Sequence, residues 1–427
     1  MLSNNKRLST LVFLFICNTP LVFAETLQEA WKQAIENNHR IKSAKAATNA
    51  SRQQLFSAQG QRLPELNIGG GYTQLSATPE VTTDVDGQAA QFPTGQDSSG
   101  KAEAIVTLPV YTGGRISHDI GAAEASLRAA QSSEAASVQD IKMQVAQAFI
   151  KVLRAESAVH VAQSHVDSLA AHEQDVKNLH AQGMVARNDL LSAQVELANA
   201  RQHAVLASNQ LDVARSFYNQ LLNRPLSQSV VLVQVQPDVP KGKLVVLSQQ
   251  ALQQRPELVT LTRQIESLQQ QAKGIHSGLL PQLAINGGYQ YQENRYQVHE
   301  GMWMVNVGMQ WKLFDGSTRH KSDAIVAQAE AIREQREDLR TRIALQVRQA
   351  WLDIQETRKR IEVTQDAIAQ AEENMKVTTD RYQQGLSTQT DVLKAEDLRT
   401  ITHDNYNNAG YDHALAVLRL RWSLGAL

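Results

Sequence analysis

The sequence predicts a mixed α and β protein with duplicated halves, in which four short strands cross a membrane and long helices lie outside it. Three observations indicate this fold: a repeated decapeptide, four segments of alternating apolar and polar residues, and two long stretches without proline. The decapeptides are "QGMVARNDLL" at 182–191 and "QGLSTQTDVL" at 384–393. A spacing of about 200 residues is too long for a solenoid repeat and indicates a duplicated half.

The N-terminus has the pattern of a secretory signal peptide. Lys6 and Arg7 precede the apolar run "LVFLFIC", and the small residues at the end of "VFA" form a cleavage pattern. We therefore assign residues 1–24 to the signal and expect export from the cytoplasm. Cys17 is the only cysteine of the sequence and lies inside this segment, so the mature chain is expected to have no disulfide.

Composition and spacing argue against an enzyme and against nucleic-acid binding. The 42 basic and 43 acidic residues nearly balance, whereas nucleic-acid binders carry a basic excess. His165 and His172 share a helix face, but seven residues along a helix is about 10 Å, too far for one metal ion. GxSxG, HExxH and phosphate-loop motifs do not occur. We predict no catalytic residue, no metal and no cofactor.

Four segments alternate between apolar and polar residues at the length of a tilted membrane strand. They are expected at about 64–74, 102–112, 281–292 and 302–314. Half-buried hairpins of a soluble domain would also alternate. We favour membrane strands because glycine and glutamine on the polar face suit a water-filled lumen, and because each half supplies one pair. The aromatic residues predicted to face lipid are Tyr72, Tyr289, Tyr291, Trp303 and Trp311.

Four strands cannot close a barrel, and an open sheet edge is not tolerated in lipid. The chain must then share its barrel with copies of itself. Two copies would give eight strands and a filled interior, and three would give twelve strands and room for a pore. The Gly, Pro, Ser and Thr-rich segment 76–101 between two strands is expected to be a loop facing outside the cell.

Long helices are predicted for most of the remaining chain. The stretches 116–180 and 318–382 lack proline, and at about 1.5 Å per residue each would span roughly 95 to 100 Å. Shorter helices at 189–222 and 391–423 return after the turns at Gly183 and Gly385. Segments 38–62 and 255–279 are expected to pack along the other half of each long helix.

The halves are joined by a segment that breaks helix. Residues 224–244 contain three of the ten prolines and are predicted to form the connection and a girdle around the middle. The first structural repeat is therefore assigned to 25–223 and the second to 245–427.

Together with the junctions "PVYTGGR" and "KLFDGST", these features resemble the TolC-like outer membrane factor (outer membrane efflux protein) family over 25–427. The resemblance implies a homotrimer whose twelve strands form one β-barrel in the outer membrane of a Gram-negative bacterium, continued by a long α-helical barrel across the periplasm. It implies the exit channel of a tripartite efflux or type I secretion system, in contact with outer-membrane lipid, a periplasmic adaptor and an inner-membrane pump. The alternative, a soluble periplasmic coiled-coil adaptor or scaffold, would explain the helices but not the aromatic strands.

The resemblance also implies that the decapeptide turns meet the adaptor at the periplasmic tip. Exposed apolar side chains there would be covered by a partner, although packing between the paired helices is an alternative. The docking residues are expected to be Gly183, Met184, Val185, Gly385, Leu386 and Ser387.

A gate is expected beside these turns, formed by Asp189, Tyr382 and Asp391. In the family, the positions of Asp189 and Tyr382 help to close the entrance through hydrogen bonds between helices. The alternative is that Asp189 and Asp391 stabilise the starts of the returning helices, with Thr388 and Asp391 at capping-box spacing. Ser387 replaces the arginine of the family's pattern and Lys394 replaces a second acid, so a closing salt bridge and a double acidic ring are not expected here.

Overall fold

A computed structural model of the chain describes residues 24–427, so the predicted signal peptide lies almost entirely outside the described residues. The fold separates into two compact units. The first, here the tip unit, combines the chain up to Gln33 with Val145–Gln236 and Ala371–Asn407. The second, here the sheet unit, combines Ala34–Gln144, Pro237–Gln370 and Asn408–Leu427. Each unit therefore takes residues from both predicted repeats.

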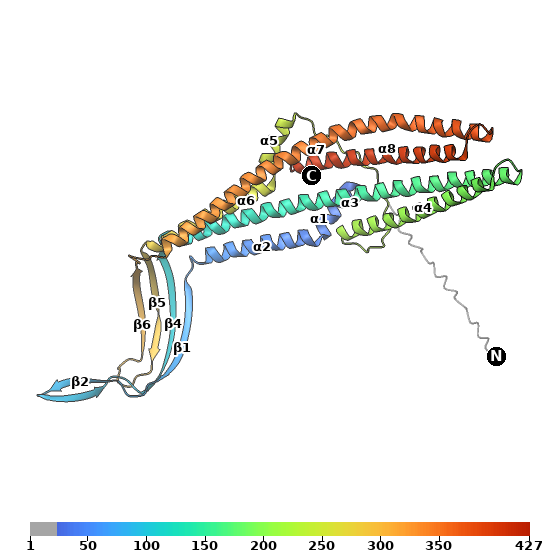
Figure 1. Cartoon of the computed structure of the whole chain (residues 1–427). Helices are drawn as coiled ribbons and strands as arrows, with labels where there is room; N and C mark the ends of the chain where they lie inside the picture. The colour runs from blue at the N-terminus through green and yellow to red at the C-terminus, as the bar shows by residue number, and fades with distance from the viewer. Residues whose placement is uncertain (1–23) are drawn as a thin grey trace, which may run out of the picture. The chain divides into compact units, whose positions relative to one another are not determined.

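The sheet unit contains one four-stranded antiparallel sheet (Figure 1). Its strands are β1 (Glu65–Gln74), β4 (Ser98–Tyr111), β5 (Gln282–Gln292) and β6 (Gly301–Gln310), in the order β1-β4-β5-β6. Each half of the sequence supplies one antiparallel pair, and β4 pairs with β5 to join the halves. The strands β1 and β6 form the edges and have no further partner within the described part of the chain.

The register gathers the alternating apolar residues on one face of the sheet. Ile68 lies opposite Ala104, which lies opposite Tyr289, and Tyr289 lies opposite Trp303. Because side chains alternate along a strand, residues two positions away on each strand share this face. The exposed fractions of Ile68 and Trp303 are 80% and 82%, so one copy leaves this apolar face uncovered.

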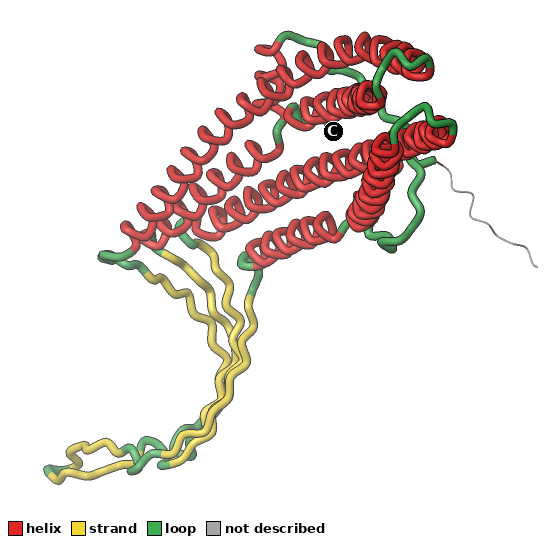
Figure 2. Tube along the Cα trace, turned by 45° about the vertical axis from the view of Figure 1, so that its right-hand side comes forward, coloured by secondary structure: helices red, strands yellow, loops and turns green. Residues whose placement is uncertain are grey.

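The segment 76–101 is not only a loop. It contains the hairpin of β2 (Glu80–Val85) and β3 (Gln88–Pro93), and β4 begins at Ser98 within it. Asp86 and Gly87 have φ of 54° and 82°, the pair of positive angles that a two-residue hairpin turn requires. Strands of six residues among Gly, Pro and Ser gave too short a pattern to predict. Figure 2 shows the hairpin beyond the end of the sheet that lies away from the helices.

The strand β6 ends at Gln310, earlier than the predicted end at residue 314. Its partner β5 begins at Gln282, opposite Gln310, because the preceding Pro281 has no N–H to donate. The Trp311 indole N–H instead donates to the Leu279 carbonyl at 3.1 Å. The junction to the next helix is therefore 311–317, compared with 112–114 in the first half.

The long helices form close to their predicted bounds. They are α3 (Arg115–Ala181), α4 (Arg187–Leu221), α7 (Thr318–Gln383) and α8 (Gln389–Ser423), and α3 and α7 have 67 and 66 residues. The packing segments are α2 (His39–Gly60) and α6 (Pro256–His276). The helices α1 (Leu27–Asn37) and α5 (Leu244–Gln254) were not predicted, and the short helix Ser277–Leu279 lies at the end of the predicted segment 255–279.

The core of the sheet unit is a thin layer between helices. Ile343, Val347 and Ala350 of α7 are buried against Leu420 of α8 and Leu247 of α5. Alanine is frequent among the buried residues, which lets the helices pack closely without a thick core. No helix within residues 24–427 has the length and apolarity needed to cross a membrane.

Candidate functional site

The two turns of the tip unit have the same backbone conformation. Gly183, between α3 and α4, and Gly385, between α7 and α8, both have φ of 74°. After each glycine an N–H donates back to the preceding helix: Met184 to the Leu179 carbonyl at 2.9 Å and Leu386 to the Arg381 carbonyl at 2.8 Å. A Cβ on either glycine would meet nothing within 4 Å. The left-handed conformation, not lack of space, therefore explains both glycines.

Apolar side chains follow both glycines and remain open to solvent in one copy. The exposed fraction of Met184 is 65% and that of Leu386 is 63%. Val185 is half-buried. Ser387 is half-buried too, and its hydroxyl donates to the Asp391 carboxylate at 3.1 Å. Each turn thus presents one large apolar side chain at its apex.

The second turn carries the capping box that its spacing predicts. The Asp391 carboxylate accepts hydrogen bonds from the Thr388 N–H at 3.0 Å and the Thr388 hydroxyl at 2.7 Å. The Asp391 N–H donates to the Thr388 hydroxyl oxygen at 3.3 Å. Hydrogen bonds from Thr388, and then from Ser387, lower the pKa of Asp391 below its usual range. Asp391 is therefore engaged in starting α8.

The first turn lacks such a cap. Ala186 occupies the N-cap position of α4, in an extended conformation and without a side chain that could accept a hydrogen bond. Asp189 lies in the first turn of α4, where the helix dipole favours a carboxylate. Its carboxylate makes no hydrogen bond to any residue in the described range. Ala186 has no hydroxyl to donate to Asp189 or to accept from its N–H, so the reciprocal bonds of the second turn do not form here.

Tyr382 lies near the end of α7 with its hydroxyl buried. Within residues 24–427 the hydroxyl has no hydrogen-bond partner. The Tyr382 ring packs against the His172 ring of α3, with centroids 5.5 Å apart and planes tilted by 56°. Burial raises the pKa of Tyr382, and the negative charges of Asp189 and Asp175 raise it further. In one copy the charge of Asp189 therefore acts on Tyr382, but the two side chains do not form a hydrogen bond.

The His172 side chain also has a buried polar atom without a hydrogen bond. Its Nε2 atom is buried and has no hydrogen-bond partner among the described residues. Burial lowers the pKa of His172, although the negative charges of Asp175 and Glu396 oppose this shift. A neutral imidazole therefore supports the Tyr382 ring.

A buried carboxylate on α8 was missed by the sequence analysis. Only 1% of the Glu396 side chain is exposed. The carboxylate accepts hydrogen bonds from the Arg399 guanidinium at 2.8 and 3.0 Å, and His165 of α3 lies 3.1 Å away. Burial alone would raise the pKa of Glu396, but the contacts with His165 and Arg399 hold it at about 2. Its place between the apolar positions of α8, beside Val392 and Ala395, was the available signal.

His165 and His172 therefore serve different partners, Glu396 and Tyr382. No group of His, Asp or Glu side chains within residues 24–427 is arranged to hold a metal ion.

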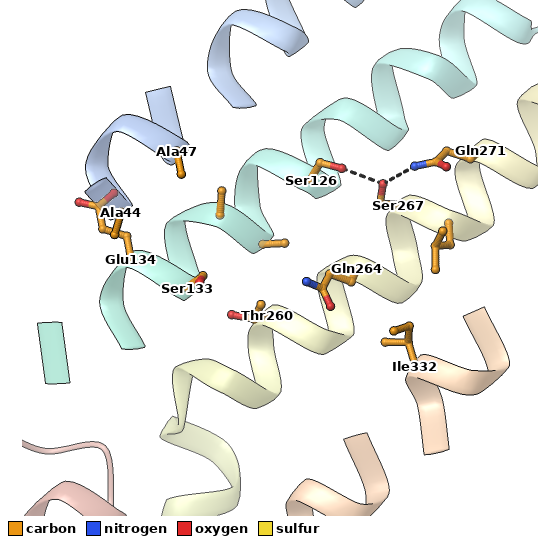
Figure 3. A pocket seen from close by; sticks show the side chains of 13 residues that line it. Ala44, Ala47, Ser126, Ser133, Glu134, Thr260, Gln264, Ser267, Gln271 and Ile332 are labelled. Carbon is orange, nitrogen blue, oxygen red and sulfur yellow. Dashed lines mark hydrogen bonds between the residues drawn. The ribbon is translucent and has the colours of Figure 1, made fainter. Parts of the chain in front are cut away.

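The sheet unit contains a cavity of about 570 Å³ between α2, α3, α6 and α7. Small and polar side chains line it, and Ser267 at its edge accepts from Gln271 at 3.2 Å and lies 2.8 Å from the Ser126 hydroxyl (Figure 3). The Ser267 hydroxyl donates to the Ala122 carbonyl at 3.0 Å, which ties α6 to α3. Ser126 and Ser267 are thus engaged in joining α3 to α6.

The predicted lipid-facing aromatics lie on or beside the sheet. Tyr72, Trp303 and Trp311 are largely exposed, and Tyr289 and Tyr291 are partly exposed. Tyr289 packs against Trp303 of the neighbouring strand with ring centroids 5.3 Å apart. These rings extend the uncovered apolar face of the sheet.

Comparison with known proteins agrees with the fold of long helices, strands and duplicated halves. The family model described as "Outer membrane efflux protein" matches residues 30–223 and 247–426. The chain is 23% identical to the outer membrane protein TolC of Vibrio cholerae over 95% of this chain and 92% of that protein. It is 26% identical to the cobalt-zinc-cadmium resistance protein CzcC of Cupriavidus metallidurans, over 68% of this chain and 66% of that protein.

Among solved structures, the outer-membrane channel OprN superposes with a TM-score of 0.79 at 17% identity, covering 94% of this chain and 90% of that one. The two matched segments correspond to the duplicated halves. The chain belongs to the outer membrane efflux protein family, the TolC-like outer-membrane channels with a periplasmic extension that serve tripartite efflux systems of Gram-negative bacteria and are not enzymes.

Proposed function

We propose that three copies of the chain assemble into one export channel, with a barrel of twelve strands in the outer membrane. The sheet with two open edges and one uncovered apolar face supports this proposal most directly. Hydrogen bonds between β6 of one copy and β1 of the next would satisfy both edges, and lipid would cover the apolar face. Twelve strands leave a water-filled lumen, whereas eight would be filled by side chains.

The tip turns are the docking surface for the periplasmic adaptor, through which the inner-membrane pump delivers its cargo. Met184 and Leu386 support this because each stands exposed at the apex of a turn, where a partner would remove it from water. The duplicated turn gives a trimer six such apices, alternating between two types.

The closed gate rests on a hydrogen bond from the Tyr382 hydroxyl to the Asp189 carboxylate. The buried, unpartnered hydroxyl and the free carboxylate support this pairing, since each lacks the partner that the other offers. Asp391 contributes charge near the entrance but is engaged by Thr388. Hydrogen bonds to a charged acceptor contribute about 2 kcal/mol each, so three copies give a closure that adaptor binding can overcome.

The test is conductance of the purified protein in planar bilayers. Tyr382→Phe combined with Asp189→Ala should raise single-channel conductance and sensitise cells to large antibiotics, while the trimer stays intact. Thr388→Ala is the matched control, since it weakens a helix cap beside the gate without touching the pair. Unchanged conductance in the double variant would place the gate elsewhere. Release of the wild-type chain by osmotic shock as a soluble monomer would refute the channel itself.

A further inference from the structure

The β2–β3 hairpin has one apolar face that nothing covers in a single copy. Its register places Val81 opposite Phe92 and Thr83 opposite Ala90 on that face. The exposed fractions of Val81, Val85 and Phe92 are 49%, 47% and 48%. The other face is polar, with Thr82 opposite Gln91. An isolated two-stranded hairpin is only marginally stable in water, so this one needs a further contact.

The base of the hairpin is fixed by the β5–β6 loop of the same copy, residues 293–300. The buried Asn294 amide donates to the Thr94 carbonyl at 3.0 Å, and the Glu293 carboxylate accepts from the Gly100 N–H at 3.0 Å. The Thr94 N–H also donates to the Pro79 carbonyl at 2.8 Å. These contacts hold the stem and leave the apolar face of the hairpin open.

The strand order identifies what lies on the other side of the hairpin. In a barrel closed by copies of this chain, which is the function proposed above, β6 of one copy pairs with β1 of the next. The β5–β6 loop leads directly into β6, and the hairpin follows directly after β1. Each hairpin therefore lies between the β5–β6 loop of its own copy and that of a neighbour.

The β5–β6 loop has side chains that complement the hairpin. Val298 is 92% exposed and Tyr296 is 43% exposed in one copy, and both lie within a few residues of the β6 edge. Arg295 extends over the Tyr296 ring at 5.1 Å. Glu80 and Asp84 alternate with Val81 and Val85 along β2 and therefore lie on the polar face of the hairpin. Exposed apolar side chains thus occur on the two surfaces that the strand order brings together.

We propose that the apolar face of the β2–β3 hairpin, formed by Val81, Val85 and Phe92, is a contact surface between copies that receives the β5–β6 loop of the neighbouring copy. Val298 of that loop packs on this face. The seam between copies therefore continues outside the membrane, where it has its own side-chain contacts in addition to the strand pairing of the barrel.

Disulfide crosslinking between two different chains tests this contact, because the sequence beyond the predicted signal has no cysteine. A tagged chain with Phe92→Cys is co-expressed with an untagged chain carrying Val298→Cys, and intact cells are treated with a mild oxidant. The expected product is a tagged-to-untagged covalent dimer that disappears on reduction. A chain with Gln91→Cys, on the opposite hairpin face, replaces the Phe92→Cys chain as control and should give several-fold less dimer.

The readouts separate this proposal from the proposed function. Trimer formation is followed without oxidant as a heat-sensitive band on gels. If the trimer is intact but the yield of mixed dimer does not exceed that of the Gln91→Cys control, the hairpin contact is refuted. The proposed barrel is not affected by that result. A dominant dimer between two Phe92→Cys chains also refutes the hairpin contact, in favour of hairpin-to-hairpin packing. Absence of any trimer in the wild-type chain instead refutes the proposed function.

Discussion

The two helical hairpins of the tip unit, α3–α4 and α7–α8, have turns of the same conformation. The side-chain contacts between their helices differ. The offset of 202 residues from Gly183 to Gly385 relates Gln194 and Leu197 to Glu396 and Arg399. Leu197 packs in an apolar cluster with Leu169 and Ala200. Its counterpart Arg399 instead pairs with the buried Glu396 of the same helix and lies 3.7 Å from Glu372 of α7. At this position the duplicated backbone therefore tolerates either an apolar or an ionic contact between its two helices.

The starts of α4 and α8, which are related by the same offset, also differ. Thr388 caps α8 and engages Asp391, whereas Ala186 leaves α4 uncapped and Asp189 free. The hairpin with the weaker start is thus the one that supplies the carboxylate of the proposed gate. A cap at this position would compete with the proposed gate for the same carboxylate.

Glu396→Ala should have the largest effect, on α8 and on its contact with His165 of α3. Removing one partner of a buried ion pair leaves the other uncompensated, which costs about 3 kcal/mol. Hydrogen exchange should speed up in 389–403. The equivalent change Gln194→Ala, at an exposed position, should alter exchange in 187–201 by less than about 0.5 kcal/mol. Equal changes in hydrogen exchange would mean that Glu396 and Gln194 contribute equally to the stability of their hairpins.

Gly183→Ala and Gly385→Ala should destabilise their turns by the same amount. Both positions have the same φ and open space around them, so the cost is that of the left-handed conformation alone, about 1 to 2 kcal/mol. Hydrogen exchange of the residues on both sides of each turn measures it. A clearly larger cost at one turn would show that the backbones are not equivalent in solution.

Exchanging the N-cap residues of α4 and α8 should stabilise the start of α4 and destabilise that of α8. Ala186→Ser completes a capping box with Asp189 and should stabilise the start of α4 by about 0.5 to 1 kcal/mol, whereas Thr388→Ala should destabilise α8 by a similar amount. Because the new serine would engage Asp189, Ala186→Ser should also raise channel conductance. Stabilisation of α4 with unchanged conductance would separate Asp189 from the gate.

The contact between the two hairpins and the start of α8 should weaken in different pH ranges, which is the smallest expected effect. Burial lowers the pKa of His172 from 6.5, so the unfolded state binds the proton first and the contact with Tyr382 weakens as pH falls below about 6.5. The pKa of Asp391 is lowered from 3.8 by its cap, so the start of α8 weakens only below about 3.8. Hydrogen exchange corrected for intrinsic rates should resolve both ranges. His172→Phe should remove the loss of stability that begins near pH 6.5. If that loss persists in the variant, another group causes it.

Much of the fold was predictable because its signals are local. Absence of proline located α3 and α7, and two-residue alternation located the four strands of the sheet, with errors only at ends such as Gln310. The hairpin β2–β3 and the helices α1 and α5 were missed because six to eleven residues carry too little periodicity to stand out.

The tip was predictable only where the interaction is local. The capping box of Thr388 and Asp391 could be predicted because its residues are three apart. The environment of Glu396 could not, since His165 lies 231 positions away along the chain. The two turns differ at the N-cap, where Ala186 stands in place of Thr388, and comparison of the repeats alone does not show that this change removes the cap.

The open edges β1 and β6 also determine how the channel is made. A chain whose sheet cannot complete its hydrogen bonds alone must finish folding through a collision with another chain. The half-time for the appearance of the heat-sensitive trimer should therefore shorten as the concentration of chains rises, whereas a barrel closed by one chain would mature at a concentration-independent rate. Until that collision the two edges and the apolar face are exposed together, so slow synthesis prolongs the state in which the chain is most prone to aggregate.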